Sequence, residues 1–256
     1  MNMLNNREGS AFHIIHIRQK DVMEHAERIP DLENNTIHVW TARFSDLDHF
    51  YRIFSNFLSR TEQKKASTFR KPADARRYIL RHGMVRFILG NYILSSPARV
   101  PLVTGRNGKP ELDLQSPDQK ITFNVSHTDE MVSIGVMKKI EIGIDIVKID
   151  PRCPIQEIAE YLFCPHEIRY LEGTRPDLRR NIFFTIWAMK EAVIKATGEG
   201  LQIIQDTDVM NRVLNPRPEL YRSDKTSTIP KDFVIFPFIP AAGYRGAVAV
   251  CVSGEK

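Results

Sequence analysis

Apolar and polar positions follow the same order of patterns in both halves of this chain. Alternation with a period of two predicts a strand at 36–42, and apolar residues three and four apart predict helices at 46–59, 61–69 and 74–94. Asp74 is the predicted N-cap of the last of these helices. Strands are predicted at 121–125, 131–136 and 140–148, and the last two should form a hairpin around Lys138 and Lys139.

The second half continues with the same order of elements. Helices are predicted at 155–162, 165–172 and 179–197, and the tail 232–252 should hold strands interrupted by Pro237 and Pro240. Each half therefore runs from a strand through helices to a long helix and then to further strands. This order indicates an α+β fold built from a duplicated unit, although the sequence itself does not visibly repeat.

The helix predicted at 179–197 carries charges within an apolar run. The segment from Trp187 to Lys195 contains Lys190 and Glu191 among apolar residues. Residues four apart share a helix face, so Trp187, Glu191 and Lys195 are neighbours, and glutamate before lysine is the favourable order for an ion pair. A structural ion pair would explain this pattern, and a functional site would explain it equally.

The strand predicted at 140–148 holds a carboxylate on a rigid support. Alternation puts Asp145 and Val147 on one face, and the opposite face carries Ile140, Ile142, Ile144 and Ile146. The isoleucines should face the core, with Asp145 facing away from it. A single aspartate in this position is usually a solvated outer residue. Together with Glu191, however, it could bind a hard cation such as Mg²⁺, which prefers oxygen ligands.

Three short motifs in the second half occur in an order and spacing that point to one family. They are Asn124-Val-Ser-His127, Gly143-Ile-Asp145 and Trp187-x-x-Lys-Glu-Ala-x-x-Lys195, the last followed by Gly198-x-Gly-Leu201. Together they resemble the 4′-phosphopantetheinyl transferases, in particular the larger, two-half type that activates surfactin synthetase. The resemblance is firm over residues 105–201 and weaker over residues 59–86.

The resemblance implies a fold and a reaction. Two similar α+β halves, 1–138 and 139–256, would be related by a pseudo-twofold axis, with coenzyme A in the cleft between them. The reaction would be that of a holo-[acyl-carrier-protein] synthase. It transfers the 4′-phosphopantetheine arm of coenzyme A to a serine of an apo acyl or peptidyl carrier protein, requires Mg²⁺ and releases 3′,5′-ADP. The fused halves imply a monomer.

The resemblance also implies roles for individual residues. Asp145 and Glu191 would bind Mg²⁺, Glu191 would also activate the serine, and Lys195 would stabilise or protonate the leaving phosphate. Contacts to coenzyme A are implied for Lys65, Arg77, Gly108, Lys109, Pro110, Ser126, His127, Lys190 and Lys195. Glu167 resembles another acid of the site, but a first-turn glutamate that stabilises a helix start explains it equally well.

Two positions depart from the family pattern. Val147 stands where the larger transferases usually carry a third carboxylate, and Glu62 stands where a second nucleotide-binding lysine is expected. Because Val147 shares a face with Asp145, the metal site loses a potential ligand, which water could replace. Two other classes stay open: a regulator that binds coenzyme A or a nucleotide without turnover, and an interaction protein in which Glu191 and Lys195 form a structural pair.

Composition adds limits to this picture. The chain of 256 residues has 36 Lys and Arg against 31 Asp and Glu, and its net charge of +5 favours anionic partners. The basic residues are scattered and follow no nucleic-acid-binding motif, so nucleic acid is not expected. Cys153 and Cys164, with His166 nearby, lack a fourth zinc ligand, and free thiols are expected. Without a signal-peptide core or a membrane-spanning apolar run, we expect a cytoplasmic protein with no membrane partner.

Overall fold

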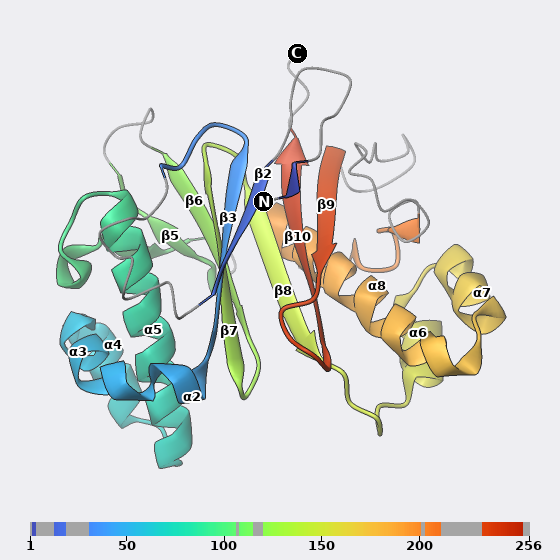
Figure 1. Ribbon diagram of the computed structural model, residues 1–256, viewed down its shortest axis with the longest axis horizontal. Helices are drawn as coiled ribbons and strands as arrows, with labels where there is room; N and C mark the ends of the chain where they lie inside the picture. The colour runs from blue at the N-terminus through green and yellow to red at the C-terminus, as the bar shows by residue number, and fades with distance from the viewer. Residues whose placement is uncertain are drawn as a thin grey trace.

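The computed structural model describes residues 2–3, 13–18, 31–105, 108–114, 120–200, 203–210 and 232–252. Helices form the two outer sides of the molecule, and two sheets lie between them, as Figure 1 shows. The order of layers is therefore helices, sheet, sheet, helices. Among the described helices, none is long and apolar enough to cross a bilayer.

The first half places its helices on one face of a five-stranded sheet. Its elements are β1 (Asn2–Met3), β2 (His13–Arg18), β3 (Thr36–Arg43), α2 (Phe44–Leu47), η2 (Asp48–Phe50), α3 (Tyr51–Phe57), α4 (Arg60–Ser67), α5 (Pro72–Tyr92), η3 (Pro97–Arg99), β4 (Leu102–Thr104), β5 (Pro110–Leu112), β6 (Ile121–His127) and β7 (Met131–Lys138). The sheet order is β1-β2-β3-β7-β6, and β4 pairs separately with β5. Only β2 and β3 run parallel among these described strands.

The second half repeats this topology with fewer strands. Its elements are β8 (Ile142–Lys148), α6 (Ile155–Leu162), α7 (Pro165–Gly173), α8 (Pro176–Thr197), β9 (Asp232–Phe238) and β10 (Tyr244–Val252). The antiparallel order β8-β10-β9 corresponds to β3-β7-β6, because β7 pairs with β3 and β6 just as β10 pairs with β8 and β9. A long helix, α5 or α8, follows the first strand each time. The α+β class predicted from the pattern is confirmed.

The hairpin predicted between β7 and β8 is wrong. β7 pairs with β3 and β6, whereas β8 pairs with β10. The chain turns at Lys139, whose φ is +63°, and passes from one sheet to the other. Both strands are apolar, so the sequence pattern fits either arrangement, and partners distant in the sequence decide the pairing.

Three local predictions also need correction. Lys71, and not Asp74, is the N-cap of α5, because Pro72 begins the helix, a position that proline favours. The helix predicted at 46–59 is divided into α2, η2 and α3. Pro237 does not interrupt β9, which tolerates it as an edge strand paired only with β10 among the described strands.

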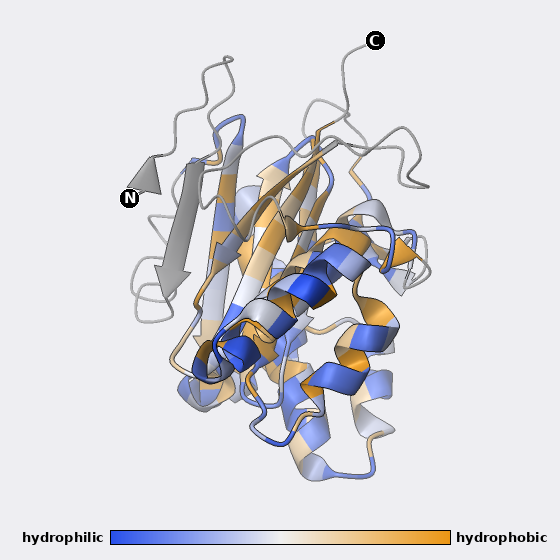
Figure 2. Cartoon of the chain, turned by 90° about the vertical axis from the view of Figure 1, so that its right-hand side faces the viewer, coloured by the Kyte–Doolittle hydropathy of each residue, from blue (hydrophilic) through white to orange (hydrophobic). Residues whose placement is uncertain are grey.

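Three apolar clusters fill the spaces between the layers. Trp40, Leu80 and neighbouring residues pack between α5 and the five-stranded sheet, and a second cluster packs between α8 and the three-stranded sheet. A third lies between the two sheets, where Val39 of β3 joins Ile144 of β8 and Val248 of β10. Figure 2 shows the complementary pattern, with hydrophilic colour on the helix surfaces that face the viewer and apolar colour concentrated on the strands behind them. The two halves therefore share an apolar interface.

Candidate active site

Gly143 lets α8 lie directly on β8. A Cβ atom at this position would lie 2.0 Å from the carbonyl oxygen of Ala192 and 2.4 Å from the backbone nitrogen of Ala196. Real Cβ atoms do not come so close to backbone atoms, so only glycine fits here. Two residues further along the same face of β8, Asp145 then lies beneath Lys195 of α8.

Asp145 is buried and lies at the centre of a hydrogen-bonded group. Its Oδ1 accepts hydrogen bonds from Lys195 Nζ at 2.6 Å and from Ser126 Oγ at 2.9 Å. The residue is only 7% exposed, because α8 covers the face of β8 that was expected to point away from the core. Burial raises the pKa of Asp145, although the Lys195 charge and the hydrogen bonds oppose this shift.

Glu191 adds a second carboxyl group one turn before Lys195 on α8. Its pKa is raised by burial and by the negative charge of Asp145, and Lys195 lowers it only in part. Two carboxyl groups with raised pKa beside one ammonium form a site with a deficit of positive charge. A divalent cation would offset this deficit, and the oxygen donors suit Mg²⁺. These residues therefore fit the implied metal.

His127 ends β6 beside this group and contacts α5. Its Nε2 is hydrogen-bonded by the guanidinium of Arg81. Burial, together with the charges of Arg81 and Lys195, lowers the pKa of His127 to about 4, so its imidazole is neutral near pH 7. Arg81 was not singled out from the other basic residues of α5 in the sequence. Its spacing of four from Arg77, one turn along the same face, was the available signal.

Two cavities open beside His127. Their volumes are about 880 Å³ and about 650 Å³, and Tyr78, Arg81 and His127 line both. The predicted residues Lys65, Gly108 and Pro110 line the larger cavity, and Arg77 lines the smaller one. All the described lining residues of these two cavities belong to the first half. The place of coenzyme A in a cleft between the halves stays a prediction.

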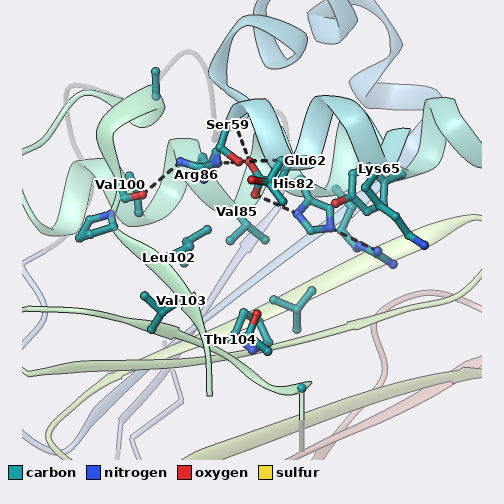
Figure 3. Close-up of a pocket in the computed structure, with 18 of the residues that line it drawn as sticks. Ser59, Glu62, Lys65, His82, Val85, Arg86, Val100, Leu102, Val103 and Thr104 are labelled. Carbon is teal, nitrogen blue, oxygen red and sulfur yellow. Dashed lines mark hydrogen bonds and ion pairs between the residues drawn. The ribbon is translucent and has the colours of Figure 1, made fainter. Parts of the chain in front are cut away.

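Glu62 forms one wall of the larger cavity. It accepts hydrogen bonds from Arg86 Nε at 2.7 Å and from the backbone nitrogen of Ser59 at 2.7 Å, and it lies 3.2 Å from His82 Nδ1. Burial alone would raise the pKa of Glu62, but these hydrogen bonds and the Arg86 charge lower it to about 2. Figure 3 shows this group on one side of the cavity and Val103 on the other. Glu62 therefore joins α4 to α5.

The residues of the Gly-Lys-Pro turn, 108–110, have two different surroundings. Gly108 has a φ of +77° and lies at the cavity together with Pro110. The Lys109 side chain points elsewhere: its Nζ donates to the carbonyl oxygen of Ile142 at 3.1 Å and to that of Lys195 at 3.2 Å. It thus connects the turn to β8 and α8 and is not among the described residues that line the cavities.

Two other predicted coenzyme A contacts, Arg77 and Lys65, interact with neighbouring side chains of the protein. Arg77 pairs with Asp74 at 2.6 Å and with Asp129 at 3.5 Å, at the edge of the smaller cavity. The ammonium of Lys65 lies 5.7 Å from the ring centroid of Phe69. Both side chains can still reach the cavities that they line.

Lys190 is not brought together with Asp145, Glu191 and Lys195. Its Nζ donates to Glu167 Oε2 at 2.7 Å and to the carbonyl oxygen of Thr207 at 2.6 Å, and both charged side chains are 0% exposed. Glu167 also caps α7, which is the helix-start role that the sequence left open. Its carboxylate lies near Cys164 and Asp208, but Lys190 and two backbone nitrogens already occupy it.

Comparisons with known proteins agree with this architecture. A model described as "4′-phosphopantetheinyl transferase, N-terminal" matches residues 40–138, and one described as "4′-phosphopantetheinyl transferase superfamily" matches residues 141–249. The chain is 28% identical over 178 residues to the 4′-phosphopantetheinyl transferase HetI of Nostoc sp., covering 70% of this chain and 75% of HetI. It is 32% identical over 155 residues to the 4′-phosphopantetheinyl transferase Sfp of Bacillus subtilis, covering 60% of this chain and 66% of Sfp.

The two family models together match both halves of the chain. The protein therefore belongs to the 4′-phosphopantetheinyl transferase superfamily, and the family predicted from the motifs is confirmed. The prediction of a transferase enzyme agrees with the names of these relatives.

Proposed function

We propose that this protein transfers the 4′-phosphopantetheine arm of coenzyme A to a serine of an apo acyl or peptidyl carrier protein and releases 3′,5′-ADP. The observation that carries the proposal is the group of Asp145, which is buried, and Glu191 and Lys195, which are half-buried. The Lys195 charge acts on His127, which borders both cavities. Charge-neutralising groups thus adjoin a space large enough for a nucleotide.

The larger cavity suits the nucleotide end of coenzyme A. Its lining combines apolar residues with the cations Lys65 and Arg81, which would attract phosphate groups. The neutral imidazole of His127 keeps one N–H to donate to a phosphate oxygen. Gly108 allows the chain to approach the ligand closely. Lys109 and Lys190 take no part in this proposal, because their ammonium groups are held by other residues.

The chemistry would take place at Asp145 and Glu191. Mg²⁺ bound by these carboxylates would neutralise and align the pyrophosphate. Glu191, whose pKa is raised, is suited to take the proton of the carrier serine. As the serine oxygen bonds to the phosphorus of phosphopantetheine, the P–O bond to 3′,5′-ADP breaks and leaves negative charge on the departing phosphate. Lys195 would stabilise that charge.

Intact-protein mass spectrometry tests the proposal. The protein is incubated with coenzyme A, Mg²⁺ and a set of apo carrier proteins, and at least one carrier should gain the mass of one phosphopantetheine. Asp145→Asn and Glu191→Gln should each slow this transfer by about 100-fold or more, because a metal ligand is lost. The control Glu157→Gln, at an exposed position on α6, should not change the rate. Wild-type rates in both active-site variants would remove these carboxylates from the site.

One observation favours a second function. Val147, at the place of the usual third carboxylate, is half-buried against the apolar core of the second half. A regulator that binds coenzyme A without turnover would show thermal stabilisation by coenzyme A and Mg²⁺ while no carrier gains mass. An interaction protein, the third class, would show neither effect; the structural pair expected for it differs here, because Lys195 pairs with Asp145.

A further inference from the structure

β8 is an edge strand whose outer side faces the other half of the molecule. Within its sheet it pairs with β10, and the third strand, β9, lies beyond β10. The backbone groups on its free edge need hydrogen-bond partners, because this edge is buried between the two sheets. Among the described residues, the partners that three of these backbone groups find are side chains of the first half.

Asn124 and Ser126 of β6 provide these partners at matching intervals. Asn124 Oδ1 accepts from the backbone nitrogen of Ile144 at 3.0 Å, and Ser126 Oγ accepts from that of Ile146 at 3.1 Å. Both side chains are buried, at 5% and 4% exposure. Two residues of β6 thus match two residues of β8, and their side chains act in place of the carbonyl groups of a neighbouring strand.

Asp145 lies between these two anchored positions. The Ser126 hydroxyl also donates to Asp145 Oδ1 at 2.9 Å and accepts from Lys195 Nζ at 3.3 Å. Its one proton and its acceptor positions are therefore used within the protein. Lys109 adds a third anchor from the first half through its bond to the carbonyl oxygen of Ile142.

We infer that Asn124 and Ser126 are positioning residues that hold β8, and with it the Asp145 carboxylate, in a fixed place relative to the cavities of the first half. Ser126 acts on Asp145 and on the strand, and not on the phosphates of coenzyme A. The inference rests on the proposed transfer reaction for its kinetic consequence, but its structural part does not.

Steady-state kinetics test the functional part. Ser126→Ala should lower kcat by about tenfold or more and raise the Mg²⁺ concentration needed for half-maximal rate, with KM for coenzyme A changed by less than about twofold. Ser126→Thr, which keeps the hydroxyl, should restore most of kcat. An increased KM for coenzyme A with unchanged kcat would overturn the inference and return Ser126 to phosphate binding.

Hydrogen exchange tests the structural part without any activity. Asn124→Ala should speed exchange of the Ile144 amide about tenfold or more, and Ser126→Ala should do the same at Ile146. Ser133→Ala is a matched control, because this buried serine on the adjacent strand β7 bonds to Thr41 at 2.7 Å and not to β8. Unchanged exchange at both amides would refute the anchoring. Absence of transfer by the wild-type protein, with faster exchange in the variants, would refute the proposed reaction alone.

Discussion

Lys195 contacts both Asp145 and Ser126 in the candidate site. Its Nζ lies 2.6 Å from Asp145 and 3.3 Å from Ser126, and its charge helps to lower the pKa of His127. The side chain is 28% exposed, so it can move from the carboxylate towards a phosphate group. A flexible ammonium suits such an exchange of partners.

Replacement of Lys195 by alanine should therefore affect the chemical step more than ground-state binding. We expect Lys195→Ala to lower kcat by about 100-fold while KM for coenzyme A rises less than about threefold. Transfer rates at varied coenzyme A concentration measure both quantities. A large rise in KM with unchanged kcat would assign Lys195 to ground-state binding of coenzyme A.

His38 introduces a pH dependence of stability far from the site. It is fully buried with its Nδ1 2.6 Å from the hydroxyl of Tyr92, and burial lowers its pKa from 6.5 to about 4. Above pH 6.5, His38 is neutral in the folded and in the unfolded chain, so it does not change the free energy of unfolding with pH. As the pH falls from 6.5 towards 4, only the unfolded chain takes up the proton, so the folded state loses stability.

The His38 contribution should be visible in denaturant unfolding at several pH values. Between pH 6.5 and pH 5, His38 should lower the free energy of unfolding by about 1.5 kcal/mol. In His38→Gln this part of the dependence of the free energy of unfolding on pH should be absent, because glutamine does not titrate. Equal slopes for the two proteins over this range would contradict a depressed pKa at His38.

At the scale of elements, the close packing of α8 on β8 depends on Gly143. The Cβ of any other residue would meet backbone atoms of Ala192 and Ala196, which cannot move without displacing the helix. The helix carries Glu191 and Lys195, and the strand carries Asp145. The distance between these elements therefore sets the geometry of the site.

Gly143→Ala should consequently lower both stability and transfer. We expect a loss of about 3 kcal/mol or more in the free energy of unfolding, because the added methyl group overpacks the interface. Urea unfolding measures this loss. Gly173→Ala is the control, since a Cβ at that position at the end of α7 would have no atom within 4 Å, and it should change stability little. Equal effects of the two substitutions would refute the steric explanation.

At the scale of the whole molecule, the apolar cluster between the sheets makes the two halves one cooperative unit. Val39 and Met137 of the first half pack with Ile144 and Val248 of the second. Separation of the halves would expose these fully buried side chains to water, which is costly in free energy. The halves should not unfold independently.

The two tryptophans of the chain allow a direct measurement, because Trp40 lies in the first half and Trp187 in the second. The variants Trp40→Phe and Trp187→Phe each keep one tryptophan. Adding Ile144→Ala to either variant should lower its free energy of unfolding by about 2–4 kcal/mol. In each variant, fluorescence and far-ultraviolet circular dichroism should give coincident urea midpoints. Separate midpoints for the two signals would show that the halves unfold independently.

The sequence by itself determined most of the long helices and strands and the chemistry that they carry. The face shared by Glu191 and Lys195 follows from helical spacing, and the place of Asp145 opposite the isoleucines follows from strand alternation. These are local properties of the backbone, fixed within a few residues. The three motifs also identified the family, which the comparisons confirm.

Only the tertiary structure decided which of these groups meet. Asp145 reaches Ser126, 19 positions earlier, and Lys195, 50 positions later, because α8 packs on one face of β8 and β6 lies along its free edge. The same packing directs Lys109 to backbone carbonyls and buries Lys190 against Glu167. No local pattern distinguishes β10 from β7 as the partner of β8. Such contacts depend on how whole elements pack together, and the residue types alone do not specify that packing.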